Sequence, residues 1–231
     1  MTGNVTNPVI LSIETGGDNC SVALSKGAEI IAIKENKDRE HSKYLSVFTD
    51  EIIKASGLQY TDIDAVAVSK GPGSYTGLRI GVATAKGICY GIDKPLIAIC
   101  SLLALTSACT RTDSDAIYCP LIDARRSEVY TALFNASLEQ LSEIEAMIIT
   151  ENSFKEILNT HKIRFFGSGA EKCKEIIKHP NAVFVETTSS ASGLVRPANE
   201  AFQNKKFENT AYFEPFYLKD FVVTKSNKTR L

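Results

Sequence analysis

The segment from Ala65 to Ile99 constrains the fold of this chain more than any other. It begins with a short apolar run and a loop of glycine, proline and serine. A long apolar stretch with helical spacing and a second short apolar run follow. Alternation of strand, helix and strand is typical of α/β proteins. The segment therefore predicts two strands joined by a helix from about Thr76 to Tyr90.

The predicted helix is apolar on almost every side, since only Arg79, Lys86 and two threonines interrupt it. A helix of this kind has to be buried on more than one side, either against its own sheet alone or also against another subunit. Gly77 and Gly81 lie on one face and would let another backbone approach closely, although each costs about 1 kcal/mol of helix propensity relative to alanine. The spacing leaves open whether that backbone belongs to the same chain.

The rest of the chain divides into two halves with a similar pattern. In the first half, three β-rich runs with short turns predict an antiparallel meander, and a helical stripe runs from Arg39 to about Ala55. After a polar run at 110–115, weaker strand and helix signals start again. We therefore expect an α/β fold of two lobes with mixed sheets, residues 1–109 and 115–231, of which the second is smaller.

Composition and charge narrow the classes of function. Hydrophobic residues make up 44% and charged residues 23%, as in soluble globular proteins. The sequence shows no signal-peptide pattern and no apolar stretch long enough for a membrane span. The formal net charge of −1 argues against strong nucleic-acid binding by the chain alone, and the short basic C-terminus is typical of a frayed end. The six cysteines form no C-x-x-C pair, so we expect a reduced, cytoplasmic protein.

Two motifs are candidates for chemistry. The loop from Gly71 to Ser74 leads from a strand into a helix, where backbone amides can hold an anion. It lacks the lysine of a P-loop and the third glycine of the Rossmann fingerprint, and a structural tight turn is the alternative. Glu14 ends the first predicted strand, where a carboxylate can serve a cleft or fix a turn. The three histidines have no metal-site spacing, so a histidine-based metal site is not predicted.

Seven short segments match one family in order, and the block from Gly71 to Arg79 is specific to it: Ile10–Thr15, Cys20–Leu24, His41–Ser42, Lys70–Gly81, Ile122–Arg125, Glu128–Tyr130 and Glu214–Leu218. They resemble the TsaB (YeaZ) family, the dimerisation subunit of the bacterial tRNA threonylcarbamoyladenosine machinery. The resemblance covers nearly the whole chain and implies an actin-like (ASKHA), ribonuclease H-like fold. It also implies that the chain is a degenerate paralogue of TsaD. TsaD is the glycoprotease-like subunit that transfers the threonylcarbamoyl group to the adenosine beside the anticodon of ANN-decoding tRNAs.

Two departures from TsaD imply that the chain is not catalytic. Ser101 and Leu105 stand where TsaD carries its metal-binding histidine pair, and leucine cannot bind a metal. The stretch from Ile122 to Arg125 stands where TsaD has a Ser-Gly-Gly-His phosphate loop, and Asp123 adds a carboxylate that repels phosphate. We therefore expect no catalytic residue, no metal and no cofactor, with ATP or ADP bound at most weakly or at a subunit interface.

The resemblance implies a partner interface on the two long helices of the first half and a vestigial anion loop beside them. The expected interface residues are His41, Leu45, Phe48, Leu78, Val82 and Ala85, and the expected loop residues are Glu14, Thr15, Gly71, Gly73, Ser74 and Arg79. The expected partners are a TsaD-like catalytic subunit and a TsaE-like ATPase subunit, with tRNA contacted only within the complex, no membrane, and a homodimer when the chain is alone. The alternatives are an actin-like ATPase or small-molecule kinase and, less in keeping with the missing histidine pair, a metallopeptidase.

Overall fold

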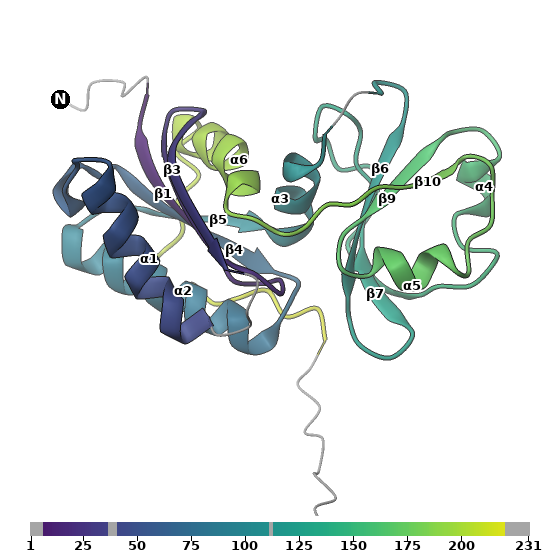
Figure 1. Cartoon of the computed structure of the whole chain (residues 1–231), viewed down its shortest axis with the longest axis horizontal. Coiled ribbons are helices and arrows are strands. Elements are labelled where there is room, and N and C mark those ends of the chain that lie inside the picture. Colours follow the sequence, from purple (N-terminus) through teal and green to yellow (C-terminus); the bar gives the residue numbers. More distant parts are fainter. Residues whose placement is uncertain (1–6, 37–40, 111–112, 220–231) are drawn as a thin grey trace, which may run out of the picture.

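The computed structural model describes residues 7–36, 41–110 and 113–219, which form two lobes (Figure 1). The strands of the first lobe are β1 (Val9–Glu14), β2 (Cys20–Lys26), β3 (Glu29–Asn36), β4 (Ala65–Gly71) and β5 (Leu96–Cys100). They form a five-stranded sheet in the order β3-β2-β1-β4-β5. β1, β2 and β3 are antiparallel, which confirms the predicted meander, whereas β4 and β5 run parallel to β1.

The sheet of the second lobe has the same topology. Its strands are β6 (Ile117–Asp123), β7 (Glu128–Thr131), β8 (Glu145–Ile148), β9 (Ile163–Phe166) and β10 (Ala182–Phe184). β6 is the central strand, as β1 is in the first sheet. The antiparallel strands β7 and β8 lie on one side of it, and the parallel strands β9 and β10 lie on the other. Both sheets thus show the ribonuclease H-like strand order, and the predicted two-lobed repeat is confirmed. β8, β9 and β10 have only four, four and three residues, so the second sheet is the smaller one.

Helices cover both faces of the first sheet. The helices are α1 (His41–Ala55), α2 (Tyr75–Ile92), α3 (Ser101–Ala108), α4 (Lys155–Leu158), α5 (Ala170–Lys174) and α6 (Ser192–Gln203), with a 3-10 turn at Tyr60–Asp62. α1 and α2 lie on one face, and α3 and α6 on the other (Figure 1). Successive residues of a strand therefore enter different cores: Leu11 packs with Leu45 of α1, and Ile10 with Leu194 of α6. This explains why the strands read as continuous apolar runs.

The C-terminal part of the chain returns to the first lobe, which corrects the predicted limits of the second lobe (115–231). Leu194 and Ala198 of α6 are fully buried in the core of the first sheet. Without α6 much of one face of that sheet would stay uncovered, and the apolar stripe of this helix covers it. The second lobe therefore contains only residues between α3 and α6.

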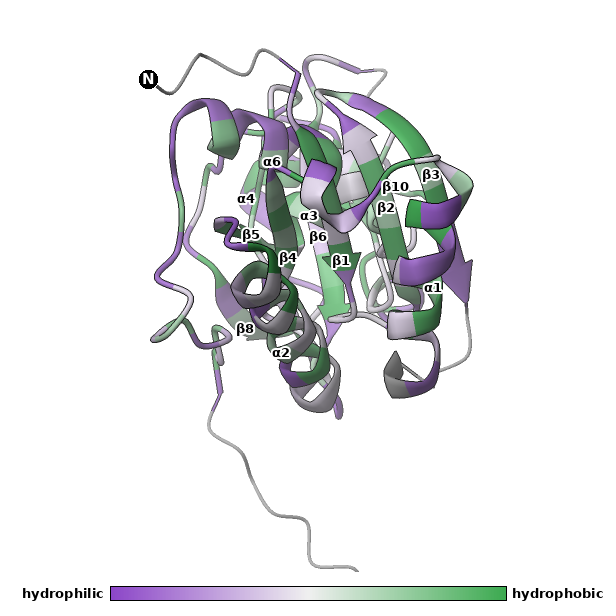
Figure 2. Ribbon diagram, turned by 90° about the vertical axis from the view of Figure 1, so that its left-hand side faces the viewer, coloured by the Kyte–Doolittle hydropathy of each residue, from purple (hydrophilic) through white to green (hydrophobic). Residues whose placement is uncertain are grey.

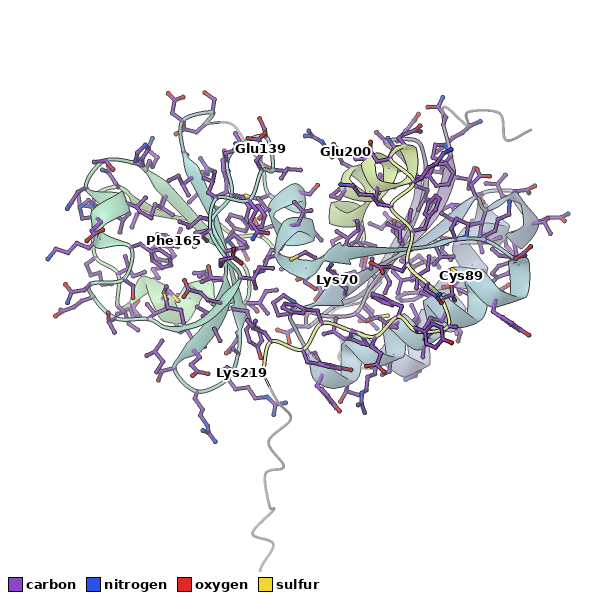
Figure 3. The ribbon with its side chains drawn as sticks, turned by 180° about the vertical axis from the view of Figure 1, so that it is seen from behind. Lys70, Cys89, Glu139, Phe165, Glu200 and Lys219 are labelled. Atoms are coloured by element: carbon purple, nitrogen blue, oxygen red, sulfur yellow. The ribbon has the colours of Figure 1, made fainter. Side chains whose placement is uncertain are left out.

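Residues 207–219, which we call the C-terminal strap, follow the first lobe after α6. Glu208 N donates a hydrogen bond to Leu96 O at 2.9 Å, and Phe216 N donates to Lys70 O at 2.7 Å. The strap therefore runs from the edge strand β5 to the end of β4, and Figure 3 shows Lys219 at its end, between the lobes. Within the described ranges, no helix combines the length and the apolar character needed to cross a membrane.

Candidate functional site

Glu14 ends β1 inside the first lobe, and its side chain is only 1% exposed. Its Oε1 accepts hydrogen bonds from Gly16 N at 2.6 Å and from the Ser69 hydroxyl at 2.9 Å. Burial has the largest effect on this carboxyl and raises its pKa to about 7, although the hydrogen bonds favour the charged form. Glu14 therefore fixes the turn after β1 to the end of β4, and its charge changes near neutral pH.

The glycine-rich loop packs against the turn after β1 through its backbone. Ser74 N donates to Gly16 O at 2.8 Å, and a Cβ on Gly73 would lie 2.5 Å from the same oxygen. The Thr15 hydroxyl donates to Gly77 O at 2.8 Å. The Ser74 hydroxyl also caps α2, because it accepts from Gly77 N at 3.3 Å. Two backbone amides that could bind an anion, Ser74 N and Gly77 N, thus donate hydrogen bonds within the chain. This favours a structural tight turn over an anion site for this loop.

Gly77 and Gly81 let α2 approach Thr15 of the same chain. A Cβ on Gly77 would lie 2.0 Å from Thr15 O, and a Cβ on Gly81 would lie 2.2 Å from Thr15 Oγ1. The close approach that their spacing predicts is therefore intramolecular. Gly87 and Gly91, further along α2, differ from this pair, because a Cβ at either position would meet no atom of the described part of the chain within 4 Å.

The C-terminal strap holds the glycine-rich loop from another side. Gly71 has a φ of 114°, and a Cβ there would lie 2.4 Å from Phe216 O. Arg79, expected beside an anion, contacts the strap: its Nε donates to the Tyr217 hydroxyl at 3.1 Å, and its guanidinium lies 4.1 Å from the centre of the Tyr75 ring. Tyr75 belongs to α2 itself, so Arg79 ties α2 to the strap through Tyr217, by the hydrogen bond and by a cation–π contact with the ring centre 5.9 Å away.

Most of the residues expected at a partner interface lie inside the first lobe. Leu45, Leu78, Val82 and Ala85 are 2%, 1%, 4% and 0% exposed. Phe48 is half-buried and stacks on Tyr44 with the ring centres 5.4 Å apart. His41 begins α1, and its side chain lies outside the described residues. The four buried side chains hold α1 and α2 on the sheet and offer almost no area to a partner.

The exposed residues of α2 are Thr76 and Arg79 near its start and Ala83, Gly87, Tyr90 and Gly91 further along, and we call the latter four the outer α2 face. These positions recur three or four residues apart and therefore line one side of the helix. Tyr90 is 87% exposed there, and Val47 of the adjacent helix α1 is 47% exposed. Figure 2 shows α2 white or green along most of its length, whereas α1 carries several hydrophilic residues. Sequence reasoning missed this face because a helix that is apolar all round does not show which side points outward.

The two positions that stand in place of a histidine pair have structural roles. Ser101 opens α3, and its hydroxyl accepts a hydrogen bond from Gly71 N at 3.1 Å. Leu105 is 1% exposed in the core between α3 and the second sheet. Among the residues that the structure describes, no group of three or more His, Cys, Asp or Glu side chains is placed to hold a metal.

A cleft of about 590 Å³ separates the turn after β1 from the second lobe. Residues 17–19 and residues of the ranges 167–174 and 184–189 line it, and Asn19 Nδ2 donates a hydrogen bond to Ser189 O at 3.2 Å. The charged side chains of the lining are Asp18, Glu171 and Glu186 against Lys174.

A family model described as TsaD, tRNA N6-adenosine threonylcarbamoyltransferase, matches residues 30–227. The chain is 29% identical over 223 residues to the tRNA threonylcarbamoyladenosine biosynthesis protein TsaB of Escherichia coli (strain K12), covering 94% of this chain and 96% of that protein. It is 30% identical over 209 residues to TsaB of Bacillus subtilis (strain 168), covering 86% and 88%. The match to TsaB of Haemophilus influenzae reaches 39% identity over 124 residues but spans only 54% of this chain and 52% of that protein.

Two solved structures from Pseudomonas aeruginosa share the fold. One is YeaZ, with a TM-score of 0.77, covering 91% of this chain and 100% of that chain. The other, described as similar to the peptidase YeaZ, has a TM-score of 0.82 and covers 92% and 100%. Both are 20% identical to this chain, so the likeness establishes the two-lobed arrangement of the elements.

Proposed function

The chain belongs to the TsaB (YeaZ) family, and on that premise we propose that it is a non-catalytic subunit that pairs with a TsaD-like transferase. The family takes part in tRNA threonylcarbamoyladenosine biosynthesis. In the proposed role, the chain is required for threonylcarbamoyl transfer to the adenosine beside the anticodon of ANN-decoding tRNAs. A TsaE-like ATPase subunit joins the assembly, and tRNA is contacted only within it.

The outer α2 face is the observation that carries the proposal. Glycine at 87 and at 91 weakens a helix by about 1 kcal/mol per position relative to alanine, and none of the residues that the structure describes occupies the space beside either one. The close approach of another backbone would account for both glycines, as Thr15 accounts for Gly77 and Gly81. The exposed ring of Tyr90 adds a large side chain of the kind that often dominates the energy of an interface.

The first lobe also supports a non-catalytic role. The hydroxyl of Ser101 is engaged by Gly71 N, and the side chain of Leu105 fills a core. Glu14 is almost fully buried beneath the loop that would face a substrate. These side chains are used in packing and in holding the backbone, so they are not available to a reacting group.

An omission assay tests the proposed role. Unmodified tRNA is incubated with the chain, TsaD, TsaE and the enzyme that forms the threonylcarbamoyl adenylate, and each component is left out in turn. We expect modification to require the chain, and the chain alone to hydrolyse neither ATP nor peptide. Unchanged modification without the chain would contradict the role, and ATP hydrolysis by the chain alone would favour the ATPase or kinase alternative.

We expect Gly87→Arg to abolish pairing with the TsaD-like subunit while the chain stays folded. The position is exposed, so the arginine is tolerated by the free chain. In a close interface the same side chain would collide with the partner or bury an unpaired charge. Size-exclusion chromatography with light scattering measures the loss of the complex. Without TsaD, the parent should form an isologous homodimer and the variant should be a monomer.

Glu156→Arg is the matched control, because it places an arginine at an exposed position of α4 in the other lobe. We expect it to leave pairing unchanged. Full pairing by a folded Gly87→Arg variant would show that the interface lies on another surface.

A further inference from the structure

The loop between β6 and β7 has an unusual backbone. Its residues Arg125 and Arg126 have φ angles of 67° and 52°, in the left-handed region that glycine and asparagine adopt readily and other residues avoid. Both residues are exposed, so no core packing requires arginine at either position. Strained backbone that displays two charged side chains is a feature of functional sites.

The acidic residues beside this loop are neutralised by lysines from other elements. Lys172 of α5 pairs with Asp123 at 2.7 Å. Lys219, at the end of the strap, forms an ion pair with Glu128. Neither Arg125 nor Arg126 has an ion-pair partner among the residues that the structure describes. The loop therefore presents two positive charges that nothing in the described chain compensates.

The backbone of the loop is fixed in place. Arg125 N donates to Asp123 Oδ1 at 2.8 Å. The Lys172 ammonium group donates to Arg126 O at 3.3 Å and to Glu128 O at 2.6 Å. A pre-organised backbone reduces the entropy that a binding contact costs. The ion pair with Lys219 also places this loop near the junction of the two lobes, where Figure 3 shows that lysine.

We propose that Arg125 and Arg126 bind the phosphate backbone of the tRNA while the partner subunit modifies it. The inference rests on the proposed function. The guanidinium fork matches phosphate oxygens in bidentate geometry, and arginine is therefore the usual residue for phosphate and nucleic-acid recognition. The phosphate-bearing partner in the proposed function is the tRNA. Because the whole chain has a net charge of −1, the contact contributes only when the partner holds the rest of the tRNA.

The test measures binding of an unmodified ANN-decoding tRNA by the reconstituted complex of this chain and TsaD over a salt series. The variant Arg125→Asn/Arg126→Gly removes both charges and supplies residues that the loop backbone favours, so its melting temperature should not fall. We expect about ten-fold weaker binding and a slope of log affinity against log salt that is smaller by about 1 to 2. Arg125→Lys/Arg126→Lys keeps the charges and should retain most of the slope.

Lys205→Asn/Lys206→Gln is the control for overall charge, because it removes two exposed lysines of the first lobe. We expect it to leave affinity and slope unchanged. An unchanged slope for Arg125→Asn/Arg126→Gly, or an equal loss for the Lys205/Lys206 control, would overturn the inference. So would a loss of TsaD pairing in the arginine variant with unaltered tRNA affinity, since the loop would then contact protein.

The omission assay distinguishes failure of the proposed function from failure of the proposed tRNA contact. If modification does not need the chain, the proposed function fails together with the inference. If modification needs the chain and the loop variant binds tRNA like the parent, only the inference fails.

Discussion

Gly77→Ala is expected to destabilise the protein by about 3 kcal/mol or more, whereas Gly87→Ala on the same helix is expected to stabilise it by about 1 kcal/mol. The added Cβ at Gly77 would lie 2.0 Å from Thr15 O, so α2 would have to move away from the turn after β1. That movement would also break the hydrogen bond from the Thr15 hydroxyl to Gly77 O. At Gly87 the added methyl group enters open space and only improves helix propensity.

Thermal unfolding of the two variants and the parent measures both effects. For a chain of this length we expect the melting temperature to fall by about 6 to 12 °C for Gly77→Ala and to rise by about 2 to 4 °C for Gly87→Ala. Dilute protein should be used, because dimerisation through the outer α2 face would raise the apparent stability of the parent. Equal, small effects at the two positions would show that α2 does not pack on Thr15 as described.

The architecture was largely predictable because the signals for it are local. Alternating apolar runs and turn residues identified the strands of the first sheet, and the same pattern after residue 115 revealed the repeat. The position of α6 was not predictable in this way. Its apolar stripe shows that the helix covers a sheet, but both lobes offer one, and only the tertiary structure assigns Leu194 to the first.

The candidate site was less predictable, because its contacts join residues far apart in the chain. Gly77, Gly81 and Gly87 look alike in the sequence, and only the position of Thr15 separates the first two from the third. Arg79 was expected near an anion, yet it bonds Tyr217, which lies 138 residues later. The residues expected at the interface are mostly buried for a related reason. A hydrophobic pattern identifies the large apolar side chains that hold α2 on the sheet, and it does not identify the small residues that α2 leaves exposed.

Glu14→Gln is expected to remove a large pH dependence from the stability of the protein. Burial raises the pKa of Glu14 from 4.5 to about 7, so between these values the folded chain holds a proton that the unfolded chain releases. The stabilising effect of this proton is complete below about pH 4.5 and is lost as the pH rises through about 7. With about 1.4 kcal/mol for each pKa unit, the loss amounts to about 3 kcal/mol.

Urea unfolding of the parent and of Glu14→Gln, at intervals from about pH 4.5 to pH 8, isolates this contribution because all other titrating groups are common to both proteins. The stability of Glu14→Gln relative to the parent should increase as the pH rises, since the amide cannot ionise in the buried site. Glu156→Gln, which changes an exposed carboxylate of α4, should follow the parent at every pH. A constant difference between parent and Glu14→Gln over this range would mean that Glu14 stays ionised in the folded chain. Its hydrogen bonds to Gly16 and Ser69 would then outweigh the cost of burial.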